Sequence, residues 1–191
     1  MKTNIAIFAS GKGSNADNIC KYFKNHPSVQ IALIVSDRKE AGVFNIADKH
    51  HVPSLHINKA GWTDTTFLLQ SLKELHIDFI VLAGFLKLIP PSLIAHFPGK
   101  IINIHPALLP SYGGAGMYGH YVHEAVHAAG ETETGITIHY VDEHYDKGDV
   151  IFQARVALNR SDTPEDIAAR IHTLEMKHFP SVIESLISSK I

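Results

Sequence analysis

Asn103 and His105 lie two positions apart near the end of the apolar run "KIINIHP" (100–106). Strand side chains alternate, so both project to the same side if this run is a strand. Ligands of open parallel sheets bind beyond the carboxyl ends of the strands. There, an amide can donate a hydrogen bond to a developing oxyanion, and an imidazole can transfer a proton near neutral pH. The spacing favours a catalytic pair; the alternative is that both side chains bond main chain at a strand–loop corner.

A cluster of carboxylates offers a partner for His105. The stretch "YVDEHYDKGDV" (140–150) carries Asp142, Glu143, Asp146 and Asp149 between two expected strands. One carboxylate beside His105 would orient the imidazole and raise its pKa. Sequence spacing does not choose among the four, and a solvated acidic turn is the alternative interpretation.

The glycine-rich stretch "ASGKGSN" (9–15) is a candidate phosphate site. It joins an expected strand to an expected helix, and free amides at a helix start, with the helix dipole behind them, suit a phosphate. It matches neither the dinucleotide-binding fingerprint nor the P-loop pattern. A plain tight turn is the alternative.

The candidate residues described above can meet only if a sheet places them in loops at the carboxyl ends of its strands. The pattern of the first half of the chain predicts such a sheet. Short apolar runs alternate with amphipathic segments, which is typical of a mostly parallel sheet covered on both faces. The expected strands are 4–10, 30–37, 52–57, 77–84 and 100–105, and the expected helices are 14–25, 44–50 and 62–75. The prediction is a single α/β domain over residues 1–191, Rossmann-like, with a mostly parallel twisted sheet and helices on both faces.

The second half predicts a different pattern. Residues 134–142 and 149–158 read as neighbouring strands, one of them antiparallel, and the chain closes with a helix capped by Thr163 and interrupted at Pro180. Pro164 at the first helical position agrees with this start. The irregular stretch 107–120 is long and glycine-rich, which is typical of a functional or mobile loop.

Composition excludes several classes of protein. The chain has 191 residues, a formal net charge of −2 and 45% hydrophobic residues, so it is globular and carries no basic field for nucleic acid. Cys20 is its single cysteine, which excludes an intrachain disulfide and favours a reducing compartment. No apolar run is long enough for a membrane span. We therefore expect a soluble cytoplasmic protein in which Cys20 is a small core residue.

Other candidate side chains have simpler interpretations. His120, His123 and His127 share a helical face, a possible metal spacing, but no carboxylate or cysteine completes the set, and a surface helix is favoured. Trp62 with Phe67 and Leu68 predicts the core face of an amphipathic helix.

Four motifs together carry a family resemblance. "FASGKGSN", "VLAGFLKLIP", "INIHPALLPSY" and "GITIHYVDEHYDKGDVIFQ" resemble the phosphoribosylglycinamide formyltransferases, a folate-dependent branch of the formyltransferase family. The resemblance implies transfer of a formyl group from 10-formyltetrahydrofolate to the amine of glycinamide ribonucleotide, in de novo purine biosynthesis. It implies small-molecule substrates, no metal, no nucleic acid, no membrane, and a monomer or homodimer.

The resemblance also implies roles for individual residues. Asn103, His105 and Asp146 match the catalytic set. The positions that match the family's binding site for the substrate phosphate and ribose are Gly13, Ser14, Asn15, His172 and Glu175. The positions that match the family's binding site for the pterin ring of the folate are Leu86, Lys87, Leu88 and Ile89, together with Asn103, Asp142, Glu143, His144, Tyr145 and Asp146. Residues of about 1–100 would thus bind the ribonucleotide phosphate, and those of about 84–155 would form the folate site and the catalytic centre.

Some positions depart from the family pattern. Ala107 replaces the usual serine, Lys147–Gly148 replaces a glycine pair, residues 61–64 lack the basic contact to the folate tail, and the loop 111–121 is longer and richer in glycine. Two alternatives remain open. One is another folate formyl-transfer enzyme, such as a methionyl-tRNA formyltransferase or a formyltetrahydrofolate hydrolase, either of which would call for an extra domain that we do not expect here. The other is a non-catalytic phosphate-ligand binder, against which the full Asn103–His105–Asp146 set argues.

Overall fold

The computed structural model, which describes residues 2–188, contains a seven-stranded sheet in the order β3-β2-β1-β4-β5-β6-β7. The strand pairs from β1 to β5 are parallel, and β6 pairs with β7 in antiparallel fashion. The predicted α/β class and mostly parallel sheet are confirmed. The chain forms two compact units, Met1–Asn103 and Ile104–Ile191, and the boundary falls inside β5 (Ile101–His105).

The first unit contains the parallel strands. β1 (Thr3–Phe8) lies between β2 (Val29–Ser36) and β4 (Phe79–Leu82), and β3 (Ser54–His56) pairs with β2. The central strand is fully buried from its third residue onward, as expected for a strand with helices on both faces. The apolar runs therefore predicted these strands correctly, although β3 is shorter than expected.

Helices connect the strands of this unit. They are α1 (Ser14–Phe23), α2 (Val43–His50), α3 (Lys59–Thr63), α4 (Thr66–Glu74) and α5 (Pro91–His96). The sequence did not predict α5, which is only six residues long. Cys20 on α1 is buried, which confirms its interpretation as a core residue.

The single helix predicted over residues 62–75 is wrong. Asp64 has an extended backbone between α3 and α4, and its carboxylate accepts hydrogen bonds from the Thr66 amide at 3.1 Å and the Thr66 hydroxyl at 2.6 Å. This side chain competes with helical bonding and starts a new helix. Phe67 was also assigned wrongly to the core face: it is 60% exposed, whereas Leu68 is buried. Trp62 packs edge-on against Phe8.

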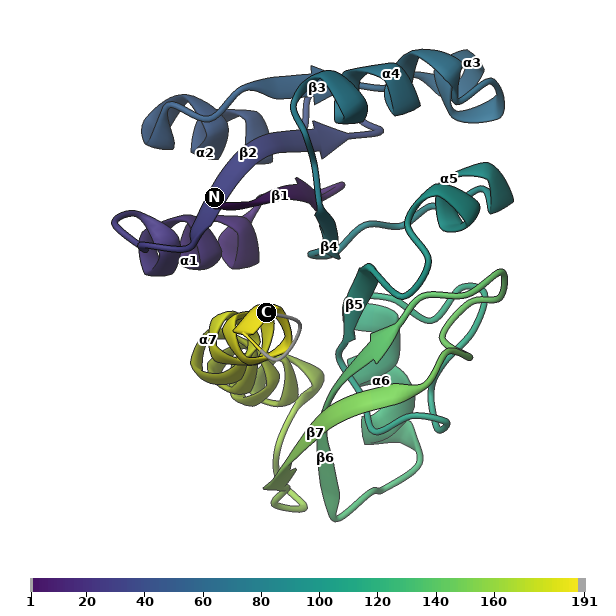
Figure 1. Cartoon of the computed structure of the whole chain (residues 1–191). Coiled ribbons are helices and arrows are strands. Elements are labelled where there is room, and N and C mark those ends of the chain that lie inside the picture. The colour runs from purple at the N-terminus through teal and green to yellow at the C-terminus, as the bar shows by residue number, and fades with distance from the viewer. Residues whose placement is uncertain (1, 189–191) are drawn as a thin grey trace. The chain divides into compact units, whose positions relative to one another are not determined.

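The second unit contains a hairpin and two helices. β6 (Glu133–Tyr140) pairs with β7 (Val150–Ala157), which confirms the predicted antiparallel neighbours. α6 (His120–Ala128) contacts α7 (Pro164–Ser188), and α7 also contacts both strands (Figure 1). Thr163 caps α7 as expected, since its hydroxyl accepts from the Asp166 amide while the Asp166 carboxylate accepts from the Thr163 amide.

The predicted interruption at Pro180 is wrong, because α7 continues through it to Ser188. A proline inside a helix removes one main-chain hydrogen bond and costs about 3 kcal/mol. Here Phe179 and Pro180 are both buried, as are Ile171 before them and Ile183 after them. Packing of this apolar face on both sides of the proline outweighs the lost bond.

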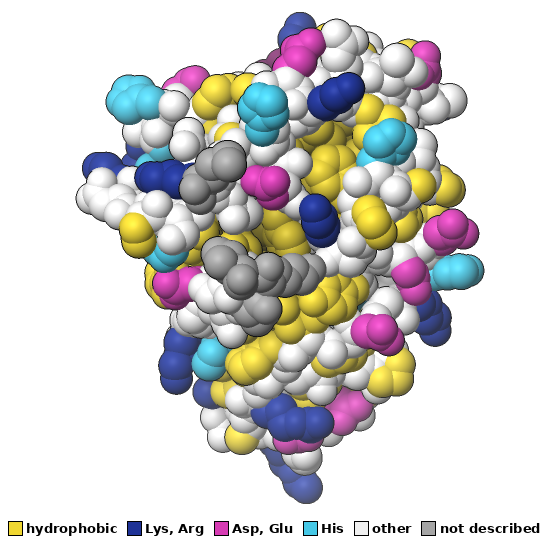
Figure 2. Space-filling model, viewed as in Figure 1, with side chains coloured by type: hydrophobic (Ala, Val, Ile, Leu, Met, Phe, Trp, Pro, Cys, Tyr) yellow, Lys and Arg dark blue, Asp and Glu magenta, His cyan; other side chains and the backbone are white. Residues whose placement is uncertain are grey.

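His120, His123 and His127 all lie on α6, but His123 is buried, so the interpretation as a wholly surface-exposed histidine face is wrong at that position. Val122 and Val126 flank it on the inner side of the helix. Within residues 2–188 no cluster of His, Cys, Asp or Glu could hold a metal ion. None of the helices in that range is long and apolar enough to cross a membrane. Acidic and basic side chains are interspersed over the face shown in Figure 2.

Candidate active site

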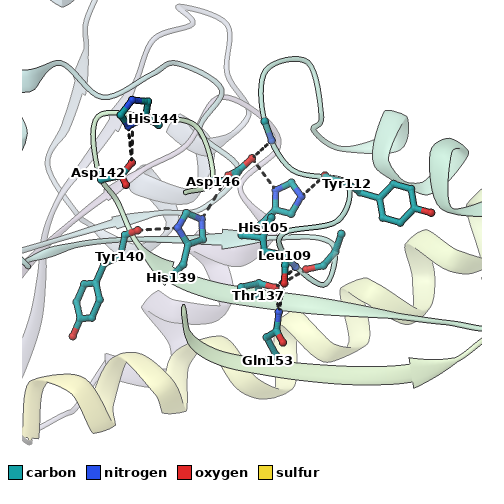
Figure 3. A network of polar contacts seen from close by, with 12 residues as sticks. His105, Leu109, Tyr112, Thr137, His139, Tyr140, Asp142, His144, Asp146 and Gln153 are labelled. Carbon is teal, nitrogen blue, oxygen red and sulfur yellow. Dashed lines mark hydrogen bonds and ion pairs between the residues drawn. The ribbon is translucent and has the colours of Figure 1, made fainter. Parts of the chain in front are cut away.

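His105 ends β5 and is almost completely buried, with 3% of its surface exposed. Its Nε2 lies 2.7 Å from the main-chain carbonyl oxygen of Tyr112 (Figure 3). Because a carbonyl only accepts, Nε2 carries a proton and donates it. Nδ1 points the other way, toward a carboxylate.

That carboxylate belongs to Asp146, whose Oδ2 lies 3.5 Å from Nδ1 of His105. The Gly114 amide donates to the same oxygen at 2.9 Å. Asp142, by contrast, accepts from the His144 amide at 2.8 Å within its own turn. The structure thus brings Asp146, the carboxylate that the resemblance selects, to His105 from among the four candidates.

Asp146 also faces a second imidazole, that of His139 on β6. His139 Nε2 lies 3.6 Å from Oδ1 of Asp146, and His139 Nδ1 lies 2.8 Å from the Tyr140 carbonyl oxygen (Figure 3). Sequence reasoning missed His139. A signal was present, because Thr137 and His139 alternate along β6 as Asn103 and His105 do along β5.

Burial and charge oppose each other in this cluster. Burial lowers the pKa of His105, while the Asp146 charge and the Tyr112 carbonyl raise it, and burial prevails. Burial raises the pKa of Asp146, but the hydrogen bond from His139, the charge of His105 and the Gly114 amide together hold it below its usual value. The result is an ionised buried carboxylate beside an imidazole that gives up its proton readily.

The loop after His105 is held by a buried polar network. Thr137 Oγ1 donates to the Ala107 carbonyl at 2.7 Å and accepts from the Leu109 amide at 3.0 Å. Gln153 Nε2 donates to Thr137 Oγ1 at 2.9 Å and to the Leu109 carbonyl at 3.0 Å. These bonds fix the start of the glycine-rich loop against the β6–β7 hairpin. Sequence reasoning missed this network as well.

Asn103 lies two residues before His105 on β5, is half-buried, and pairs with Leu82 of β4. Its position on the strand places its side chain on the same side as that of His105, as the sequence predicts.

The glycine-rich stretch 9–15 forms a turn at the start of α1. Gly13 has φ = +84°, and a Cβ there would lie 2.9 Å from Cγ2 of Val43, so both the conformation and the space require glycine. Ser14 is exposed and Asn15 is buried in the first turn of the helix. Beside this turn is a cavity of about 360 Å³, lined by Ser10, Gly11, Lys12, Arg38, Glu40, Ala41 and Gly42. A helix start with two nearby cations suits an anion.

The segment Leu86–Ile89 is held in place by side chains. The Leu86 amide donates to Ser10 Oγ at 3.1 Å, and that hydroxyl donates to Asp37 at 2.5 Å. Trp62 Nε1 donates to the Leu88 carbonyl at 3.1 Å. The main chain expected to meet the folate ring is therefore fixed near both ends, with Lys87 exposed between them.

The remaining predicted residues lie in two places. His172 and Glu175 are one turn apart on α7, with His172 Nδ1 3.7 Å from Glu175 Oε2. The Glu175 side chain is 15% exposed and that of His172 is 50% exposed. Glu143, His144 and Tyr145 form the exposed part of the turn that leads to Asp146.

The chain is similar over its whole length to several known proteins. The chain is 39% identical to the phosphoribosylglycinamide formyltransferase of Bacillus subtilis, over 95% of this chain and 93% of that protein. It is also 39% identical to the chloroplastic phosphoribosylglycinamide formyltransferase of Vigna unguiculata, of which it spans 62% of the length. The crystal structure of phosphoribosylglycinamide formyltransferase from Bacillus halodurans superposes with a TM-score of 0.90 at 34% identity, over 99% of this chain and 97% of that one.

A family model described as formyl transferase matches residues 3–183. The matched range includes the glycine-rich turn, the end of β5 and the turn that contains Asp146, so it covers the candidate site residues described above. The chain therefore belongs to the formyl transferase family.

Proposed function

We propose that this chain is a phosphoribosylglycinamide formyltransferase, which transfers the formyl group of 10-formyltetrahydrofolate to the amine of glycinamide ribonucleotide in de novo purine biosynthesis. The observation that carries the proposal is the buried His105–Asp146 pair at the carboxyl end of β5, in a chain of the formyl transferase family. The names of relatives from bacteria and plants support the same substrate. The single reduced cysteine suits a cytoplasmic location.

The chemistry requires charge stabilisation and one proton transfer. The substrate amine attacks the formyl carbon, and the C=O electron pair moves onto oxygen. The Asn103 amide and protonated His105 stabilise that oxyanion, while Asp146 orients the imidazole and favours its charged form. The intermediate collapses as the C–N bond to the folate breaks. The amine proton reaches the leaving nitrogen through His105 or a water held by Asp146.

Binding of the two substrates is assigned to separate segments. Gly13, Ser14 and Asn15 bind the phosphate at the start of α1, and Glu175 with His172 binds the ribose hydroxyls. The pterin is bound by the main chain of Leu86–Ile89 and by the turn from Asp142 to Asp146. The ribonucleotide phosphate site thus falls within residues of about 1–100, and the folate and catalytic residues within about 84–155. No step calls for a metal.

The test mixes the protein with glycinamide ribonucleotide and 10-formyltetrahydrofolate and follows the release of tetrahydrofolate and formylated ribonucleotide. Parallel reactions omit the ribonucleotide or replace it with methionyl-tRNA. We expect turnover only with the ribonucleotide, and its loss in His105→Asn. Release without any acceptor would indicate a hydrolase, formylation of the tRNA would indicate the related transferase, and binding without turnover would indicate a non-catalytic protein.

A further inference from the structure

Ser10 lies two residues after β1, in the glycine-rich turn that leads to the phosphate assignment at the start of α1, but its hydrogen bonds lead elsewhere. The residue is buried, with 2% of its surface exposed. Its Oγ accepts from the Leu86 amide at 3.1 Å, and its own amide donates to the Gly84 carbonyl oxygen at 3.0 Å. Both bonds join the turn to the stretch that follows β4, the neighbour of β1 in the sheet. Ser10 therefore connects the turn to the segment assigned to the pterin.

Asp37, the residue after β2, fixes the direction of the Ser10 hydroxyl. Its Oδ1 lies 2.5 Å from Ser10 Oγ. An ionised carboxylate only accepts, so the hydroxyl hydrogen points toward Asp37 and the oxygen lone pairs remain for the Leu86 amide. Without a fixed acceptor, a serine hydroxyl rotates about its C–O bond. Asp37 thus makes Ser10 an acceptor of fixed direction.

The segment Leu86–Ile89 is anchored at one donor and one acceptor, the Leu86 amide on Ser10 and the Leu88 carbonyl on Trp62 Nε1 at 3.1 Å. The Leu88 carbonyl and the Ile89 amide belong to one planar peptide unit, so Trp62 also sets the direction of that amide. Among the described residues, the amides of Lys87 and Ile89 have no hydrogen-bond partner. The two anchors therefore hold the segment while these amides stay available to a ligand.

We propose that Ser10 is a positioning residue for the cosubstrate, holding the start of the pterin segment from within the glycine-rich turn. This inference rests on the proposed function, which assigns the pterin to the main chain of Leu86–Ile89. Without the Ser10 hydroxyl, the Leu86 amide loses its partner and the peptide units before Leu88 gain rotational freedom. Binding the pterin must then order them first, and that entropy cost weakens binding.

Binding of the ribonucleotide should not depend on this hydroxyl. The helix start is determined separately, because Gly13 has φ = +84° and lies so close to Val43 that a Cβ would be 2.9 Å from Cγ2. The Val43 amide also donates to the Gly11 carbonyl oxygen at 3.1 Å. A residue of the glycine-rich turn should therefore affect the affinity for the folate and not that for the ribonucleotide.

The experiment measures binding of 10-formyltetrahydrofolate alone and of glycinamide ribonucleotide alone by titration calorimetry. Ser10→Ala removes the acceptor of the Leu86 amide. Asp37→Ala leaves the hydroxyl free to rotate, whereas Asp37→Asn keeps a side-chain oxygen that accepts from it. Thr65→Val is the matched control, because it also removes a buried hydroxyl of the same unit, one that bonds Ser92 Oγ at 2.7 Å.

Ser10→Ala should raise the Kd for 10-formyltetrahydrofolate roughly 10-fold, the effect of about one hydrogen bond, and leave the Kd for the ribonucleotide unchanged. In steady-state kinetics the KM for the cosubstrate should rise while kcat at saturation changes little. Asp37→Ala should give a smaller rise, and Asp37→Asn should restore the wild-type value. Thr65→Val should change neither Kd. Hydrogen exchange of the Leu86 amide, followed by NMR without ligand, should be faster in Ser10→Ala than in the wild-type protein.

Unchanged affinity for the folate in Ser10→Ala overturns the inference, even when the wild-type protein transfers the formyl group. Equal weakening of both substrates also overturns it, because Ser10 would then support the whole turn rather than the pterin segment. If Ser10→Ala does not fold, the difference between Asp37→Ala and Asp37→Asn decides, and equal affinities of these two for the folate overturn the inference. A wild-type protein that does not transfer the formyl group overturns the proposed function instead.

Discussion

At the scale of single residues, His105 and Asp146 should act as one catalytic group. His105→Asn should reduce kcat by roughly 10²–10⁴-fold, because the proton donor and oxyanion partner is lost. Asp146→Asn should cost a comparable factor, because the imidazole loses the opposite charge that favours its protonated form. The double variant should be little worse than either single one, since residues that act together are non-additive. Steady-state kinetics of all three variants check this.

The neighbouring carboxylates provide the control for that prediction. Asp142→Asn, Glu143→Gln and Asp149→Asn should each lose much less kcat than Asp146→Asn. Losses that multiply in the double variant would show that His105 and Asp146 work independently.

Glu175 offers a second residue-scale prediction. Glu175→Ala should raise the KM for glycinamide ribonucleotide by about 10- to 100-fold, the equivalent of one lost charge-assisted hydrogen bond, with the fold intact. Glu184→Ala, further along the same helix, is the control. Equal KM values for the two variants would show that Glu175 takes no part in binding the ribonucleotide.

Sequence reasoning could select His105 from its strand-end position, but not its carboxylate. The choice of Asp146 over its neighbours depends on how the turn folds back. Asp146 has φ = +55°, and a Cβ at Gly148 would lie 1.9 Å from the Tyr140 carbonyl oxygen, so this close approach exists only because residue 148 is glycine. Local spacing does not encode such a contact. The sharing of Asp146 with His139 is likewise a product of tertiary structure.

At the scale of elements, the start of α1 should determine ribonucleotide binding. Ser14→Ala should weaken binding of glycinamide ribonucleotide by about 1.5–3 kcal/mol, the range for a hydrogen bond to a charged group, and should leave folate binding unchanged. Binding isotherms with each ligand measure this, and Asn18→Ala, one turn further along α1, serves as control. If the substitution weakened the binding of both ligands equally, the assignment of the phosphate to this helix start would be wrong.

The contact between the β6–β7 hairpin and the loop that follows His105 should depend on Thr137. Thr137→Val removes a hydroxyl that bonds Ala107, Leu109 and Gln153, and leaves their buried polar groups without that partner. The free energy of unfolding should fall by about 1–3 kcal/mol. Urea titration measures it. Thr173→Val, which removes an exposed hydroxyl bonded within α7, should cost less, and an equal cost would show that the network adds nothing.

Strands and helices were predictable from the sequence where a single local pattern was strong. The buried strands followed from apolar runs, and the start of α7 followed from Thr163 and Pro164. Prediction failed where a local rule met a competing interaction. The break at Asp64 arose from one side chain that bonds the next helix start, and the continuity through Pro180 arose from packing that no local pattern reveals.

At the scale of the whole molecule, stability should fall in two steps as pH decreases. Burial lowers the pKa of His105 and of His123 below the usual value of 6.5. The unfolded chain therefore binds protons more readily than the folded one, and stability present above that value is lost below it. The second step belongs to Asp146 and Asp17. Burial raises the pKa of Asp17, but hydrogen bonds from Lys21, Lys49 and His50 outweigh it and hold it well below 3.8, so stability is lost below that value.

Urea midpoints measured from about pH 8 to pH 3 check this dependence. His123→Gln should reduce the first step without affecting the second. Stability that increases on acidification from about pH 7 to pH 5 would contradict the assignment.

The hydrogen bond from Trp62 to Leu88 has an optical consequence. Trp62 is the only tryptophan in the chain, and its indole N–H is bonded to the main chain of the segment assigned to the pterin. Its ring also packs against Phe85, the residue just before that segment. Indole emission depends on hydrogen bonding and on the polarity around the ring. The protein therefore carries an intrinsic fluorescent reporter beside the segment proposed to bind the pterin, and a change in its emission on addition of the cosubstrate tests that proposal without an attached dye.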